Sequence, residues 1–196
     1  MQNCEKEIQI RISTEPPDAL DCENLVLGLF SDERPPRGYC GLIDWRLNGM
    51  ISKELAGGRI TGSLMEKVLI APNRRTLSSK VLLWGFGNST ELTYDILYNA
   101  GYNISQTIVK IGSFDFAFNV PTAGSRNLSV SLMTEAMVTG GFDFFSTNIE
   151  KSGPFSLCVL SDESSLDEIV LGLYKVKIDV KDRIRFDILD AKKGRL

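Results

Sequence analysis

Two glycine-bearing loops have residue types that could hold an anion. Residues 85–89 read Gly-Phe-Gly-Asn-Ser and residues 121–125 read Pro-Thr-Ala-Gly-Ser, and each follows a predicted strand and precedes a predicted helix. Small residues at such a turn let backbone N–H groups and a helix N-terminus approach a phosphate. An ordinary strand-to-helix turn has the same composition, so both interpretations stay open. The candidate ligand-binding residues are Gly85, Gly87, Asn88, Ser89, Thr122, Ala123, Gly124 and Ser125.

The first loop departs from the dinucleotide-binding pattern. Thr90 stands where the third glycine would fall, and no acidic residue follows at a strand end about 20 residues later. This excludes a dinucleotide-binding assignment. A third glycine-rich stretch, residues 57–63, runs from a predicted helix to a predicted strand and indicates only a flexible connection.

The chain of 196 residues contains no histidine, the commonest general base and zinc ligand. This excludes Ser-His-Asp triads, Cys-His dyads and zinc sites that use histidine. The carboxylates Asp44, Asp95, Glu135 and Asp143 are scattered, and each is more simply a helix-surface or capping charge. We therefore expect no catalytic residues, no metal and no cofactor.

The four cysteines point to the same conclusion. Cys4, Cys22, Cys40 and Cys158 include no C-x-x-C pair, the spacing that a zinc or redox site would favour. In a reducing compartment they are expected to be buried thiols.

Composition indicates an ordinary globular domain. Hydrophobic residues make up 43% and charged residues 24% of the chain, and the longest apolar runs are six residues, far short of the roughly 20 that cross a bilayer. The first seven residues are polar and acidic, unlike a secretory signal. We expect one domain over residues 1–196, a cytoplasmic location and no membrane.

Charge is uneven along the chain. Its net value is −3, yet residues 175–196 carry eight Lys and Arg against four Asp. A basic end can contact nucleic acid, but solvated chain ends are commonly charged and the overall charge is negative. Nucleic acid is therefore not an expected partner.

Apolar runs of strand length alternate with amphipathic stretches of helix length, which is typical of an α/β domain with a largely parallel or mixed sheet. Several of the strand candidates are apolar on both faces, as strands covered by helices on each side must be. The predicted strands cover residues 8–13, 24–30, 67–71, 80–85, 113–120 and 155–160.

Helices are predicted over residues 38–55, 88–108, 127–141 and from 165 onward. The second would start at Asn88, with Glu91 as its capping-box partner, and Gly101 would weaken its middle. Gly140 and Gly141 would end the third. Residues 175–188 also alternate well enough for a terminal strand or hairpin, so helix and strand stay open there.

Aromatic residues are expected in the core or at an interface. They include residues 142–145 (Phe-Asp-Phe-Phe) and the tryptophans Trp45 and Trp84. No basic residues interleave with them to form a stacking platform for nucleic acid.

Several motifs resemble, in their order, the N-terminal domain of the cytosol (leucyl) aminopeptidase family. They are the run Gly-Tyr-Cys-Gly-Leu-Ile-Asp-Trp-Arg at residues 38–46, Gly-Arg-Ile-Thr-Gly at 58–62, the strand at 67–72 and Val-Leu-Leu-Trp-Gly-Phe-Gly at 81–87. Residues 135–143 resemble the end of a later helix of that domain, so the resemblance covers residues 20 to 145. It implies a three-layer α/β/α domain with a macro-domain-like mixed sheet flanked by helices.

The resemblance does not extend to the catalytic domain of that family, which binds two metal ions with Lys, Asp and Glu. Residues 190–196 echo its Asn-Thr-Asp-Ala-Glu-Gly-Arg-Leu signature only loosely, because a lysine stands where the metal-binding glutamate would be. We therefore expect a non-catalytic interaction domain that self-associates or docks on a partner protein. The alternatives are a macro-like binder of a nucleotide or ADP-ribose-type ligand, and a DNA-binding regulatory domain.

Overall fold

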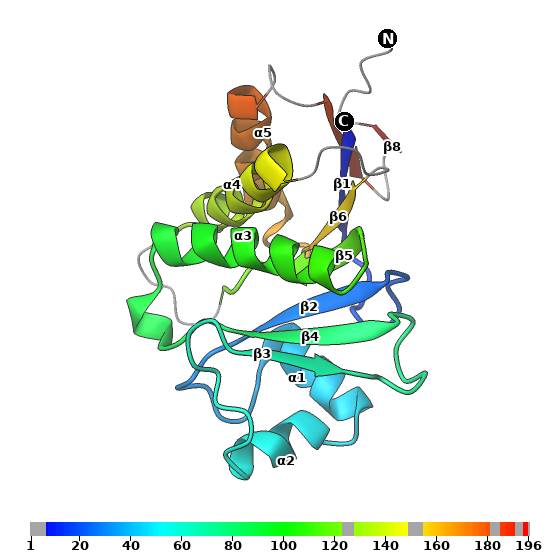
Figure 1. Cartoon of the computed structure of the whole chain (residues 1–196), viewed down its shortest axis with the longest axis vertical. Helices are drawn as coiled ribbons and strands as arrows, with labels where there is room; N and C mark the ends of the chain where they lie inside the picture. The colour runs from blue at the N-terminus through cyan, green and yellow to red at the C-terminus, as the bar shows by residue number, and fades with distance from the viewer. Residues whose placement is uncertain (1–6, 123–127, 149–154, 181–184, 191–193, 196) are drawn as a thin grey trace.

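The computed structural model describes residues 7–122, 128–148, 155–180, 185–190 and 194–195 (Figure 1). The strands in these ranges are β1 (Glu7–Ser13), β2 (Asn24–Leu29), β3 (Lys67–Ile70), β4 (Lys80–Gly85), β5 (Asp115–Asn119), β6 (Phe155–Leu160), β7 (Arg185–Asp190) and β8 (Gly194–Arg195). The helices are α1 (Gly38–Arg46), α2 (Met50–Ala56), the 3-10 turn η1 (Ser89–Glu91), α3 (Tyr94–Lys110), α4 (Val130–Asn148) and α5 (Leu166–Val180).

These strands form one sheet in the order β3-β4-β2-β5-β6-β1-β7-β8. The six inner strands are parallel, whereas β3 and β8 run antiparallel to their neighbours at the two edges. β1 lies between β6 and β7, so that Ile10 is opposite Leu157 on one side and Ile188 on the other. All six predicted strands are present.

Two apolar cores cover the two faces of the sheet. Alternate residues of β2, β4, β5 and β6 point to opposite cores: Leu25 and Leu27 of β2 pack with α1 and α2, and Val26 between them packs with α3, α4 and α5. Figure 1 shows α3, α4 and α5 grouped apart from α1 and α2. The apolar pattern on both faces of these strands is therefore explained by a helical layer on each side.

The prediction of one helix over residues 38–55 is wrong in one respect, because the structure has two helices there, α1 and α2. Asn48 and Gly49 between α1 and α2 have positive φ angles of 59° and 70°, a conformation that asparagine and glycine tolerate best. Gly49 N–H donates to the carbonyl of Asp44 (2.8 Å), and Ser52 N–H in the first turn of α2 donates to the Asp44 carboxylate (3.0 Å). Asp44 thus caps the second helix from within the first.

The predicted start of α3 is also wrong. The Asn88 side chain accepts from Thr90 N–H (2.9 Å), but it caps only the short turn η1, because Leu92 then adopts an extended backbone. α3 begins at Tyr94, where the Thr93 hydroxyl accepts from Ile96 N–H.

The glycines of α3 and α4 serve close packing. Contrary to prediction, α4 does not end at Gly140 and Gly141 but continues to Asn148. A Cβ atom added at Gly101 would lie 1.9 Å from the carbonyl oxygen of Met137, and one added at Gly140 would lie 1.9 Å from that of Tyr98. Glycine at these positions lets the two helix backbones touch, so Gly101 supports the packing of the helix that it was expected to weaken.

Helix and strand were both open for residues 175–188, and the structure has one of each there. α5 continues to Val180, and β7 begins at Arg185. No helix in the described ranges is long and apolar enough to cross a membrane.

Candidate functional site

A cleft of about 290 Å³ opens at the carboxyl ends of three adjacent parallel strands. Gly28 and Phe30 line it from the end of β2, Asn119 from the end of β5, and Ser161 and Asp162 from the end of β6. The N-terminus of α1 forms another wall. Open α/β sheets bind ligands at this edge, because the loops that leave the strands there surround a natural crevice.

Arg37, immediately before α1, brings a positive charge to the cleft. In the described part of the chain its guanidinium has no hydrogen bond or ion pair. Arg34 in the same proline-rich loop differs, because its guanidinium donates to the carbonyls of Phe30 (3.1 Å) and Thr61 (2.8 Å). Arg34 thus holds the loop, and Arg37 is available to an anion.

Carboxylates balance this charge. Glu33 accepts a hydrogen bond from the backbone N–H of Arg37 (2.5 Å), at the start of α1. Hydrogen bonds from the Ser164 hydroxyl and Ser165 lower the pKa of Asp162, which stays ionised. Burial, with Asp162 adding a smaller effect, raises the pKa of Tyr39, so its phenol stays neutral and able to donate.

Of the predicted ligand-binding residues, Thr122 lines this cleft. Ala123, Gly124 and Ser125 lie outside the described residues. Gly85, Gly87, Asn88 and Ser89 are not part of the cleft lining. A ligand-binding role for Thr122 stays a prediction.

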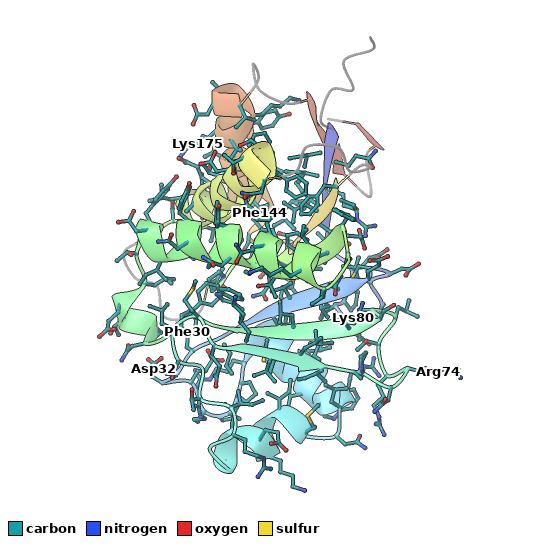
Figure 2. All side chains as sticks on the ribbon, viewed as in Figure 1. Phe30, Asp32, Arg74, Lys80, Phe144 and Lys175 are labelled. Atoms are coloured by element: carbon teal, nitrogen blue, oxygen red, sulfur yellow. The ribbon has the colours of Figure 1, made fainter. Side chains whose placement is uncertain are left out.

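Four of the five backbone N–H groups of the 85–89 loop donate to acceptors within the chain. Gly87 N–H donates to the Gly62 carbonyl (2.9 Å), and the N–H and hydroxyl of Ser89 donate to the Asp32 carboxylate (2.9 and 2.6 Å). Figure 2 shows Asp32 near Phe30 at one end of the strands, with Arg74 and Lys80 at the other end. A carboxylate of the chain therefore takes the hydrogen bonds that Ser89 could give to an anion, and a ligand-binding role for Gly85, Gly87 and Asn88 stays a prediction.

The connection at residues 57–63 is more ordered than a flexible link. The Glu66 carboxylate accepts from the N–H groups of Thr61 (3.0 Å) and Gly62 (2.6 Å). A Cβ atom at Gly85 would lie 2.0 Å from the carbonyl oxygen of Ser63, so the two glycine loops pack against each other.

Sequence reasoning missed Glu33, Arg37, Tyr39 and Asp162. The available signal was their position, because each stands in a loop directly after a predicted strand or at the helix start that follows it. The carboxylates that the sequence offered for acid–base chemistry do not line the cleft. Asp143 accepts from the Tyr98 hydroxyl (2.8 Å), and Glu135 pairs with Lys175 (3.4 Å).

Cys22, Cys40 and Cys158 are free and buried, as predicted, and burial raises the pKa of each thiol to about 12. Cys4 lies outside the described residues. Among the residues that the structure describes, no three His, Cys, Asp or Glu side chains come together in a way that could hold a metal ion.

A family model, "Cytosol aminopeptidase family, N-terminal domain", matches residues 26–145. A search of curated proteins found no match. The fold is similar to a Trypanosoma brucei macrodomain in complex with ADP, with 15% identity, a TM-score of 0.66 and coverage of 85% of this chain and 69% of that chain. An Oceanobacillus iheyensis macrodomain with MES bound gives 11% identity, a TM-score of 0.68 and coverage of 86% and 92%.

A mutant of tomato leucine aminopeptidase gives 16% identity and a TM-score of 0.60 over 89% of this chain. The chain spans 37% of the length of that enzyme. At these identities the solved structures show the fold alone, and together with the family match they confirm the predicted macro-domain-like α/β/α architecture.

Proposed function

The chain belongs to the cytosol aminopeptidase family through its N-terminal domain, and from this premise we propose that it is a non-catalytic binding module whose cleft takes a small phosphate-bearing ligand of the nucleotide type. The observation that carries the proposal is the Arg37 guanidinium, which has no hydrogen bond or ion pair to any described residue and lies beside a cleft of about 290 Å³, a volume near the lower end for small-molecule sites. Arg37 offers a planar set of donors suited to phosphate oxygens. That the Trypanosoma brucei macrodomain holds ADP on a similar fold supports this class of ligand.

The test measures binding of ADP and ADP-ribose by thermal shift and calorimetry. Ligand at 100 times its dissociation constant should add about 2.7 kcal/mol, which is a rise in Tm of about 5–10 °C for a chain of this size. No rise at millimolar ligand would refute the proposal.

A matched pair of variants locates the site. Arg37→Ala removes the charge at the cleft and should weaken binding about 10- to 100-fold, because a hydrogen bond to a charged group contributes about 1.5–3 kcal/mol. Arg74→Ala removes the same charge at the opposite end of the strands (Figure 2) and should leave affinity unchanged. Equal losses in both variants would indicate a nonspecific charge effect.

A second candidate function, self-association, is favoured by an apolar stripe on α5. Leu171 and Ile178 are 53% and 66% exposed, and Tyr174 lies between them at helical spacing. Exposed apolar residues in a row on one helix are typical of an association surface. Light scattering after gel filtration should give a mass above one chain, and Ile178→Glu should reduce it to the monomer. A monomer at high concentration would refute this role.

The absence of peptidase chemistry is tested directly. With added divalent metal, the protein should release no product from an aminoacyl amide substrate. Measurable, metal-dependent turnover would refute the non-catalytic proposal.

A further inference from the structure

The outer face of α1 carries three large side chains that lead out of the cleft. Tyr39 and Leu42 line the cleft, and Trp45 follows one turn later. Residues three apart on a helix are neighbours, and six residues advance about 9 Å along its axis. We call these three residues the α1 stripe.

Trp45 stands out because it is 71% exposed, whereas Trp84, the other tryptophan, is fully buried. An indole this exposed is uncommon, because tryptophan is on average a highly buried residue. Of the expected positions, core or interface, Trp84 lies in the core, and for Trp45 the interface stays a prediction.

The exposed indole has a cation over its ring. The Arg46 guanidinium lies over the Trp45 ring, with Cζ 5.0 Å from the ring centroid. Arg46 is itself held by Asp18, with 2.6 Å between Nη2 and Oδ2, and its carbonyl accepts from Arg75 (3.3 Å). A basic residue thus accompanies this tryptophan, contrary to the sequence-based expectation. An aromatic ring fixed by a cation is a preorganised stacking surface.

We propose that the α1 stripe is a subsite for a planar ring, and that it seats the nucleobase of the ligand whose phosphates lie near Arg37. This inference rests on the proposed function and adds the orientation of the ligand to it. Arg37 directly precedes α1 and Trp45 lies near its end, so phosphate and base would lie along the helix in that order. The stripe is continuous with the cleft through Leu42, which favours one ligand that occupies both.

The test separates base from phosphate by using ADP and pyrophosphate as probes with the wild type and Trp45→Ala. Removal of one base–aromatic stack should weaken ADP binding about 5- to 100-fold and leave pyrophosphate binding within twofold. Trp45→Phe should restore most of the ADP affinity, since a ring remains. Leu69→Ala, which changes an exposed apolar residue on the edge strand β3, should change neither.

Fluorescence gives a readout that affinity alone does not. Because Trp45 is exposed and Trp84 is buried, ADP should protect the accessible part of the emission from acrylamide quenching, and pyrophosphate should not.

The outcomes distinguish the two proposals. If the wild type binds ADP and Trp45→Ala binds it equally well, the subsite is refuted and the cleft function stands. If the wild type binds neither probe, the cleft function fails and the subsite fails with it. If Trp45→Ala lowers the mass in light scattering without lowering ADP affinity, Trp45 belongs to a protein interface and the subsite is refuted.

Discussion

Replacing Gly101 with alanine should weaken the contact between α3 and α4, although helix propensity alone predicts the opposite. The new methyl group would lie 1.9 Å from the carbonyl oxygen of Met137, and Cβ contacts below 3.0 Å are essentially never seen. The two helices would therefore have to separate by more than about 1 Å at a point where they touch backbone to backbone.

Two opposing effects set the magnitude. Alanine stabilises a helix interior by about 1 kcal/mol relative to glycine, whereas overpacking a core costs about 1–3 kcal/mol and occasionally more. Because the obstructing atom belongs to the backbone and has no rotamer to change, we expect the upper part of that range. The net loss is about 2 kcal/mol, which corresponds to a fall in Tm of about 4–8 °C for a chain of this length.

Calorimetry or circular dichroism measures the shift, with Asn99→Ala as the control. Asn99 is exposed on the same helix, so alanine there should be neutral or raise Tm slightly through propensity alone. If Gly101→Ala also raised Tm, the close approach of α3 and α4 would be refuted.

Three further predictions concern other parts of the fold. The hydrogen bond to Asp143, with burial, raises the pKa of Tyr98 to about 12. The contribution of this hydrogen bond to stability should therefore be complete below pH 10 and be lost as pH rises through 12. Tyr98→Phe should remove the last step of a spectrophotometric tyrosine titration. Asp44→Ala should lower the free energy of unfolding in urea by about 1–2 kcal/mol, because α2 loses the carboxylate that accepts from Ser52, and an unchanged midpoint would contradict the cap. The three buried thiols should react with a thiol reagent only in denaturant, since protonated thiols are poor nucleophiles, and rapid modification of Cys40 in the folded state would contradict their burial.

The sequence was most informative about the inner strands. Runs such as residues 24–29 and 80–85 are apolar on both faces, and a run of that kind has few uses other than a covered parallel strand. The order of the strands could not be predicted, because the placement of β1 between β6 and β7 depends on pairing between distant residues. The break between α1 and α2 had a usable signal, the dipeptide Asn48-Gly49, which favours positive φ.

The candidate site was harder to predict. The glycines at 85 and 87 suggested an anion loop, but whether their neighbours' N–H groups are free depends on tertiary acceptors such as Asp32, which lies 57 positions from Ser89. Composition cannot show that such a position is already filled. Arg37 was overlooked for the opposite reason, since only the fold shows that its guanidinium has no partner among the described residues while Arg34 in the same loop is engaged.

The position of β1 also determines when the sheet can be completed as the chain is synthesised. Ile8 pairs with Phe155 on one side and Phe186 on the other, so its partners leave the ribosome only after residues 14–154 have been made. Until then the apolar residues of β1 have no strands to pair with. A chain released before β6 is made would leave these residues exposed, which favours aggregation and binding by chaperones. Among the described strands β1 comes first along the chain, yet it can join the sheet only after β6 has been made.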